Sequence, residues 1–119
     1  MRRADIADVV RRAGVAPGDV LLVHSSLSSF GHVDGGAEAV IEALRDVLGA
    51  DGLLIMPTFT RCRVASGRAE PAVAFDPART ACRDRTGAVP DTFWRMDGVC
   101  RSAHPTHSLA AAGARAAEF

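Results

Sequence analysis

The sequence contains no lysine and no tyrosine, and aromatic residues make up only 5% of its 119 positions. All fourteen basic side chains are therefore arginines, and fourteen acidic side chains balance them to a formal net charge of zero. This balance argues against bulk electrostatic attraction to nucleic acid or to an anionic membrane surface. Arginine is nevertheless the better residue for bidentate contacts with phosphate or carboxylate groups.

Cysteine is scarce, with Cys62, Cys82 and Cys100 forming an odd number and no CxxC pair. This usage indicates free thiols in a reducing compartment, so we expect a cytoplasmic protein without a disulfide framework. Long apolar runs are also missing, and no apolar signal core follows the N-terminal arginines, so we expect no membrane partner. The length and the 48% hydrophobic content fit one modest domain over residues 1–119.

The hydrophobic periodicity predicts helices and strands in alternation. We expect helices over 4–13 and 37–48 and from about Pro90, strands over 20–24 and 53–57, and the start of another helix at 114–119. Both strands are apolar almost without a break, which is typical of strands buried on both faces of a parallel sheet. The sequence therefore predicts an α/β fold with helices packed on a mainly parallel sheet. Residues 58–85 lack periodicity, and so long an irregular stretch is usually functional or flexible.

A first candidate site is the segment "HSSLSSFGHVDGG" (24–36), between a strand and a helix. Ligands of open α/β sheets bind beyond the carboxyl ends of the strands, and helix N-termini favour anions such as phosphate. The alternative is that the serines only cap and turn the chain. The segment is neither a GxGxxG fingerprint nor a Walker loop, which argues against an ordinary Rossmann or P-loop site.

A second candidate site is "RSAHPTHS" (101–108). Cys100, His104 and His107 are three possible zinc ligands, but Pro105 prevents one helical face from presenting both histidines and no fourth ligand has zinc-like spacing. A histidine beside a serine is also a base–nucleophile arrangement. A third reading is a turn in which both histidines bond to the backbone. We expect no metal ion.

A third candidate is the arginine-rich character of the irregular stretch, which is either a solvated loop or the rim of a site for a phosphate-bearing cofactor. Asp76 and Asp84 dilute its positive charge. The arginines concerned are Arg61, Arg63, Arg68, Arg79, Arg83 and Arg85.

Two motifs in this order, "VHSSLSS" and "RSxHPTHS" with "MPT" between them, closely resemble the aminoglycoside 3-N-acetyltransferase family. The resemblance runs from about Gly18 to Gly113, nearly the whole chain. It implies an α/β fold distinct from the GNAT fold, and transfer of acetyl from acetyl-CoA to the 3-amino group of a 2-deoxystreptamine aminoglycoside. The implied partner is thus a small-molecule antibiotic.

The resemblance also implies which residues form the site. The first motif and the start of the next helix would lie along the pantetheine and pyrophosphate of CoA; these residues are His24, Ser25, Ser26, Leu27, Ser28, Gly35 and Gly36. The second motif would lie close to the acyl-transfer centre, with Arg101, Ser102 and Ser108 as further cofactor contacts and His107 as the candidate catalytic residue.

One feature of the family has no counterpart in this sequence. Family members are much longer, and their later half carries a "GxxHxxNT…HxxE"-type segment with the histidine and glutamate given the general-base role. We therefore expect this chain to correspond to the N-terminal portion of such an enzyme, carrying mainly the cofactor site, with self-association or a missing C-terminal half as partner. The alternative is an inactive α/β module that binds CoA or a nucleotide.

Overall fold

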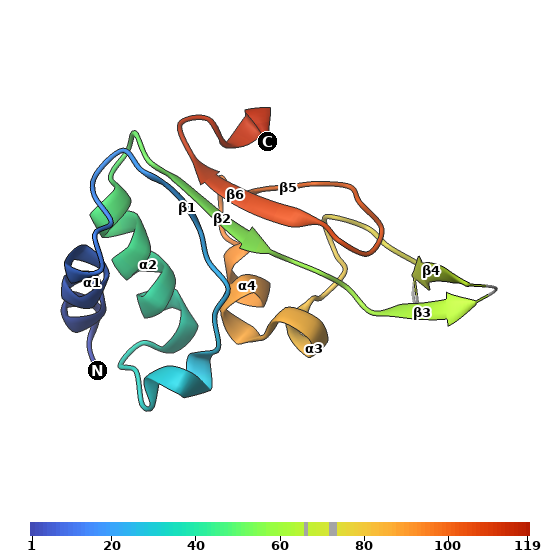
Figure 1. Ribbon diagram of the computed structural model, residues 1–119, viewed down its shortest axis with the longest axis horizontal. Helices are drawn as coiled ribbons and strands as arrows, with labels where there is room; N and C mark the ends of the chain where they lie inside the picture. The colour runs from blue at the N-terminus through green and yellow to red at the C-terminus, as the bar shows by residue number, and fades with distance from the viewer. Residues whose placement is uncertain (66, 72–73) are drawn as a thin grey trace.

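The computed structural model describes residues 1–65, 67–71 and 74–119, and its described side chains exclude those of 63–65, 69 and 70. The described elements form a four-stranded sheet in the order β1-β2-β6-β5, a separate two-stranded hairpin, and helices beside them (Figure 1). They are α1 (Arg3–Arg12), β1 (Val20–Leu22), the 3-10 helix η1 (Leu27–Phe30), α2 (Gly36–Leu48), β2 (Leu53–Pro57), β3 (Cys62–Ala65), β4 (Arg68–Pro71), α3 (Arg83–Thr86), α4 (Ala88–Phe93), β5 (Cys100–Arg101), β6 (Leu109–Gly113) and the 3-10 helix η2 (Ala116–Glu118).

The main sheet is mixed, which confirms the α/β class and corrects the expected mainly parallel arrangement. β1 pairs with β2 in parallel, with Val20 opposite Leu53, as the crossover through α2 requires. β6 runs antiparallel to both β2 and β5, so one of the three pairings described in this sheet is parallel. The physical reason is that the chain after β2 returns at the edge where β2 ends, and Leu109 pairs with Pro57 there.

The two faces of β2 are covered by different elements. Leu54 and Met56 belong to the large core that includes residues of α1, α2 and α4. Leu53 and Ile55 point to the opposite face, where they cluster with Ala111 of β6 and with Ala116 of η2. The predicted strand 53–57 is thus buried on both faces, and the alternation of its side chains decides which layer each one joins.

The strand predicted over 20–24 was also expected to be buried on both faces, but β1 is not, because it lies at the edge of the sheet. Val20 is 65% exposed and Leu22 is 54% exposed, whereas Leu21 and Val23 pack against the core. An unbroken apolar run does not reveal whether a second layer exists to cover both of its faces. In the described part of the chain, the outward face of β1 is open.

The irregular stretch 58–85 contains more regular structure than its pattern predicted. β3 and β4 form an antiparallel hairpin that projects from the body of the molecule (Figure 1). A turn at Asp76–Thr80 and the short helix α3 bring the chain back to the core. The final helix expected over 114–119 is a single 3-10 turn, and none of the described helices could span a membrane.

Candidate functional site

Both sequence motifs lie at one edge of the main sheet. Beyond β1, the backbone N–H of Val23 still donates to the carbonyl of Ile55 at 2.9 Å, and the serine-rich segment follows. Beyond β2, the N–H groups of Thr58 and Thr60 donate to the carbonyls of Ser108 and Thr106 at 2.9 and 3.0 Å. The first motif follows the carboxyl end of β1, which lies beside that of the parallel strand β2. The second motif reaches the same edge because the chain returns there to pair with the end of β2.

The serine-rich segment presents polar groups outward. His24, Ser26 and Ser28 are exposed, and the hydroxyls of the two serines lie 3.0 Å apart. Leu27 is half-buried against the core and begins η1. The hydroxyl of Ser25 is buried, and no described residue provides it with a hydrogen-bond partner. The segment therefore offers a row of short donors and acceptors at the surface above one unsatisfied hydroxyl.

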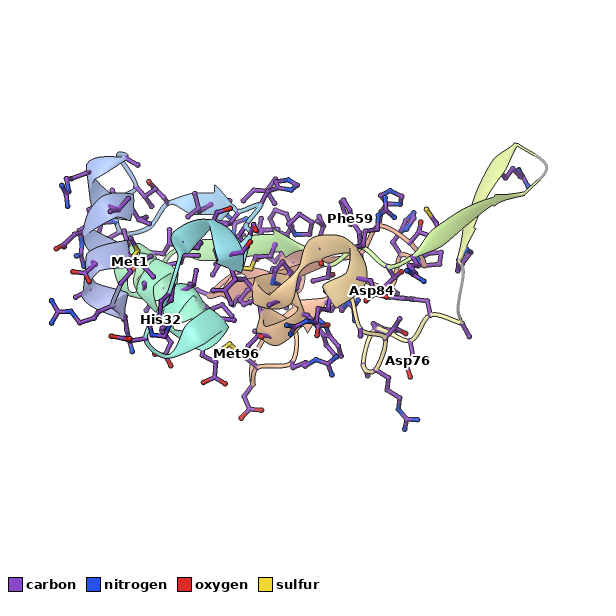
Figure 2. All side chains as sticks on the ribbon, turned by 90° about the horizontal axis from the view of Figure 1, so that it is seen from below. Met1, His32, Phe59, Asp76, Asp84 and Met96 are labelled. Carbon is purple, nitrogen blue, oxygen red and sulfur yellow. The ribbon has the colours of Figure 1, made fainter. Side chains whose placement is uncertain are left out.

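The N-terminus of α2 lies at the end of the same segment. Gly35 and Gly36 both have positive φ, at 87° and 63°, and Gly35 offers no side chain to cap the helix. The preceding loop is held by Met1, whose ammonium group donates to the carbonyl of His32 and whose own carbonyl accepts from the N–H of Asp34, both at 2.9 Å (Figure 2). The first N–H groups of a helix without a side-chain cap favour an anion such as phosphate.

The second motif contains a buried polar network beneath the surface. The hydroxyl of Ser108 donates to the carbonyl of Thr58 at 2.9 Å and lies 2.8 Å from the Thr58 hydroxyl. The Nε of Arg101 donates to both hydroxyls, at 3.2 and 3.3 Å. Ser102 accepts from the N–H of Leu109 at 2.9 Å, which closes the turn between β5 and β6. These contacts hold the end of β2 against β6.

Arg101 connects this network to the segment before α3. Its guanidinium donates to the carbonyls of Thr80 and Pro77 at 2.6 and 3.4 Å, and it lies between two aromatic rings. The guanidinium carbon is 4.5 Å from the ring centroid of Trp94 and 5.2 Å from that of Phe75. Burial lowers the pKa of Arg101. The guanidinium is thus engaged by carbonyls, hydroxyls and rings of the protein itself.

The two histidines of the second motif have different surroundings. The Nδ1 of His104 accepts from the backbone N–H groups of Thr106 and His107, at 3.2 and 2.9 Å, which is the turn-forming role considered for it. His107 is exposed; its Nδ1 lies 2.8 Å from the hydroxyl of Thr106 and its Nε2 lies 3.3 Å from a guanidinium nitrogen of Arg85. His107 is therefore held by side chains and not by the backbone.

The zinc alternative for Cys100, His104 and His107 receives no support from this geometry. Within residues 1–65, 67–71 and 74–119, no group of three His, Cys, Asp or Glu side chains could hold a metal ion. All three cysteines are free thiols. Cys82 is fully buried beside Thr86 and Asp91, and burial raises the pKa of its thiol.

The arginine-rich stretch divides into separate environments. Arg61 pairs with Asp84 at 3.5 Å and Arg79 with Asp76 at 3.8 Å, both at the surface. Arg83 and Arg68 are exposed, and the side chain of Arg63 lies outside the described residues. Among the described arginine side chains of this stretch, Arg85 alone reaches the second motif, at His107, and it also contacts the carbonyl of Thr60 at 3.0 Å, the sulfur of Cys62 at 3.5 Å and the ring of Phe59 at 5.3 Å.

Three residues of this edge were not singled out from the sequence. Thr58 and Thr60 follow β2 directly, and both are buried. Asp91 on α4 accepts from the N–H of Cys82 and from the indole of Trp94, at 2.9 and 3.1 Å. The alternation Thr58-Phe59-Thr60 after an apolar strand was the available signal, because polar residues at a strand's carboxyl end commonly face a site.

Comparison with known proteins agrees with this arrangement of motifs. The family model for aminoglycoside 3-N-acetyltransferase matches residues 22–119. The chain belongs to this family. A curated relative, aminoglycoside N(3)-acetyltransferase IV from a Salmonella species, is 43% identical over 118 residues. The alignment covers 99% of this chain and 42% of that relative, so the chain spans less than half of the relative's length.

Two solved structures of the family resemble this chain in fold. The aminoglycoside acetyltransferase AAC(3)-IVa, as a histidine-to-alanine mutant in complex with a gentamicin, has a TM-score of 0.85 and 41% sequence identity over 98% of this chain and 42% of its own. AAC-IIIb, in a binary complex with CoASH, has a TM-score of 0.84 and 32% identity over 98% of this chain and 47% of its own. The family's fold therefore extends over almost all of the present chain.

Proposed function

We propose that this chain forms the acetyl-CoA-binding portion of an aminoglycoside 3-N-acetyltransferase. The observation that carries the proposal is the combination of exposed hydroxyls with an α2 N-terminus that has no side-chain cap, both at the carboxyl edge of β1. CoA carries a pyrophosphate and an extended pantetheine with amides, which match these two features in chemistry. The CoASH complex of the related AAC-IIIb supports this choice of ligand.

The proposed cofactor residues fall into two groups by burial. His24, Ser26 and Ser28 are exposed, and with Gly35 and the start of α2 at Gly36 they are the candidates for direct contact with CoA. The N–H of Gly36 itself donates to the carbonyl of Val33 at 3.0 Å, so the N–H groups that follow it in the first turn of α2 are the candidate donors. Ser25 and Leu27 are partly buried beneath them, where they would shape the floor of the segment.

The cofactor residues expected in the second motif have a different proposed role. Arg101, Ser102 and Ser108 already bond to protein groups. We therefore propose that these three residues hold the edge of the sheet in position. The direct contacts with CoA are assigned to the first motif.

The transfer itself forms a C–N bond between the antibiotic amine and the acetyl carbonyl and breaks the thioester C–S bond, with CoA leaving as the thiol. The amine is mostly an ammonium group at neutral pH, so it must lose one proton to a base before it attacks, and the second proton that it loses on forming the amide is taken up by the CoA thiolate. His107 is the candidate base among the residues of this chain, because its imidazole is exposed at the edge of the sheet where both motifs lie. The resident base of the longer relatives remains the alternative.

The proposed acceptor is a polycationic aminoglycoside, supported by the gentamicin complex of AAC(3)-IVa. A polycation is best held by carboxylates without other partners. Asp76, Asp84 and Asp91 are each paired with an arginine of this chain. We therefore assign cofactor binding to this chain and the main part of the acceptor cleft to further polypeptide.

The direct test is calorimetric titration of this chain with CoA. The double variant Ser26→Ala/Ser28→Ala should lose affinity by roughly tenfold or more, since a hydrogen bond to a charged group is worth about 1.5–3 kcal/mol. Ser29→Ala, an exposed serine of the same 3-10 helix outside the proposed set, is the matched control and should bind as the parent does. Equal CoA affinity in parent and double variant, with both folded, would refute the assignment.

A further inference from the structure

The side chain of Arg85 contacts four separate groups at the edge of the sheet where the second motif lies. One guanidinium nitrogen donates to the carbonyl of Thr60 at 3.0 Å and lies 3.5 Å from the sulfur of Cys62. The other lies 3.3 Å from the Nε2 of His107, and the guanidinium carbon is 5.3 Å from the ring centroid of Phe59. Figure 2 shows Phe59 beside α3, the helix that carries Arg85 and the labelled Asp84.

The contact between Arg85 and His107 fixes the direction of its hydrogen bond. A guanidinium has five N–H donors and no acceptor, so the Nε2 of His107 must contribute its lone pair. The ring hydrogen of a neutral His107 must then be on Nδ1, which donates to the hydroxyl oxygen of Thr106 across a distance of 2.8 Å between the two heavy atoms. A second positive charge on the ring would face the guanidinium directly, so this arrangement suits only the neutral imidazole.

The neighbouring groups hold the ring of His107 in one orientation. Its centroid lies 4.8 Å from that of Phe59 with the planes at 54°, and 5.7 Å from that of His104 with the planes nearly perpendicular. The backbone donors already occupy the Nδ1 of His104, so a neutral His104 carries its hydrogen on Nε2. The two adjacent histidines therefore have opposite tautomers for identifiable reasons.

We propose that Arg85 is a positioning residue that holds His107 as the neutral, Nδ1-protonated tautomer by donating to the Nε2 lone pair. The proposal rests on the proposed function only in what it implies for catalysis. A general base must be neutral and must direct a lone pair at the N–H that it deprotonates. His107 can therefore act on an acceptor amine only when that amine replaces the guanidinium of Arg85 as the donor at Nε2.

The test is nuclear magnetic resonance of the four histidine side chains in 15N-histidine-labelled protein at about pH 8, where an ordinary imidazole is neutral. Long-range 1H–15N correlations distinguish a protonated ring nitrogen from one with a lone pair. In the parent protein, His107 should have its hydrogen on Nδ1 and His104 should have it on Nε2. An Nε2-protonated His107 in the parent overturns the proposal without any variant.

Variants of Arg85 test whether the guanidinium is the cause. Arg85→Met removes every donor, so the His107 signals should move toward the Nε2-protonated form or an average of both. Arg85→Lys keeps a cationic N–H donor group and should retain the parent tautomer. Arg83→Met, which removes an exposed arginine from the same helix, is the matched control and should leave the spectrum of His107 unchanged. An unchanged His107 tautomer in a folded Arg85→Met protein overturns the proposal.

This experiment separates the inference from the proposed function. The tautomer of His107 is read from the protein alone, without CoA or antibiotic. A failure to bind CoA would refute the proposed function and leave the tautomer result standing. A wrong tautomer would remove the role of Arg85 and leave CoA binding by the first motif intact.

Discussion

The hydroxyls of Thr58 and Ser108 lie 2.8 Å apart and are both fully buried, although 50 positions separate the two residues in the chain. Arg101 donates to both. Three polar side chains thus satisfy one another at the point where β2 ends, and the motif serine at this position is a structural group of the edge. Each member of this network should be costly to remove, because a buried partner left unsatisfied is destabilising.

Ser108→Ala should lower the free energy of unfolding by about 1–3 kcal/mol, since the buried hydroxyl and carbonyl of Thr58 each lose one of their hydrogen bonds and keep only the one from Arg101. Urea denaturation followed by circular dichroism measures the change. Ser28→Ala, which removes an exposed hydroxyl, should change stability by less than about 0.5 kcal/mol. Equal stabilities for the Ser108 variant and the parent would show that the buried network contributes little.

Arg101→Lys should destabilise the fold nearly as much as Arg101→Met, by about 2–4 kcal/mol. A lysine ammonium is a point charge and cannot bond to Thr58, Thr80 and Ser108 at once while stacking on Trp94. Thermal unfolding of the two variants beside the parent makes the comparison. A lysine variant as stable as the parent would mean that charge alone, and not the planar guanidinium, is what the position requires.

Asp91 should make stability depend on pH in the acid range. Burial by itself would raise the pKa of this carboxyl, but the donors from Cys82, Trp94 and Arg95 outweigh burial and lower it. A folded-state pKa below the unfolded value contributes stability above about pH 4, and this contribution is lost as the pH falls through the folded-state pKa. Asp91→Asn should therefore be less stable than the parent at pH 7, with the difference shrinking below about pH 4.

The control for Asp91 is Asp97→Asn, which changes an exposed carboxylate a short distance along the chain. Its unfolding midpoint should follow that of the parent across the same pH series. A constant difference between the Asp91 variant and the parent from pH 7 to pH 3 would contradict the assigned pH dependence.

The isolated chain should bind CoA and still be a slow acetyltransferase. Its described acidic residues near the second motif are paired with arginines, and the Nε2 of His107 is occupied by Arg85. Loss of general-base assistance typically costs about 10²–10⁴-fold in rate, so turnover should fall well below about 1 s⁻¹. A thiol-release assay with acetyl-CoA and a panel of 2-deoxystreptamine antibiotics measures it. Turnover at ordinary enzyme rates, lost in His107→Ala, would instead establish His107 as a sufficient base.

The open face of β1 should cause concentration-dependent association. Val20 and Leu22 are exposed side by side on an edge strand, which is the arrangement that recruits further chains. Val20→Thr/Leu22→Thr keeps strand propensity and should lower the sedimentation-average mass at high concentration. Val9→Thr removes a valine of α1 that is 53% exposed and lies outside the sheet, and it is the control. A parent protein that stays monomeric over the whole concentration range would contradict this expectation.

The local sequence pattern was sufficient to predict those helices and strands whose burial follows from their own residues. The periodic apolar positions of α2 and the five apolar residues of β2 predicted both elements within a residue, since hydrophobic periodicity acts over a few neighbouring positions. The two motifs and their order were likewise sufficient to identify the family, because each motif is a continuous stretch of the chain.

Only the tertiary structure decided what depends on distant neighbours. β1 has the apolar run of a buried strand, but its outward face is open because no described element packs on it. The direction of β6, the carbonyls that engage Arg101 and the arginine that faces His107 all depend on contacts between residues more than 20 positions apart. Such contacts depend on how whole helices and strands pack together, and the pattern of residues along the chain does not specify that packing.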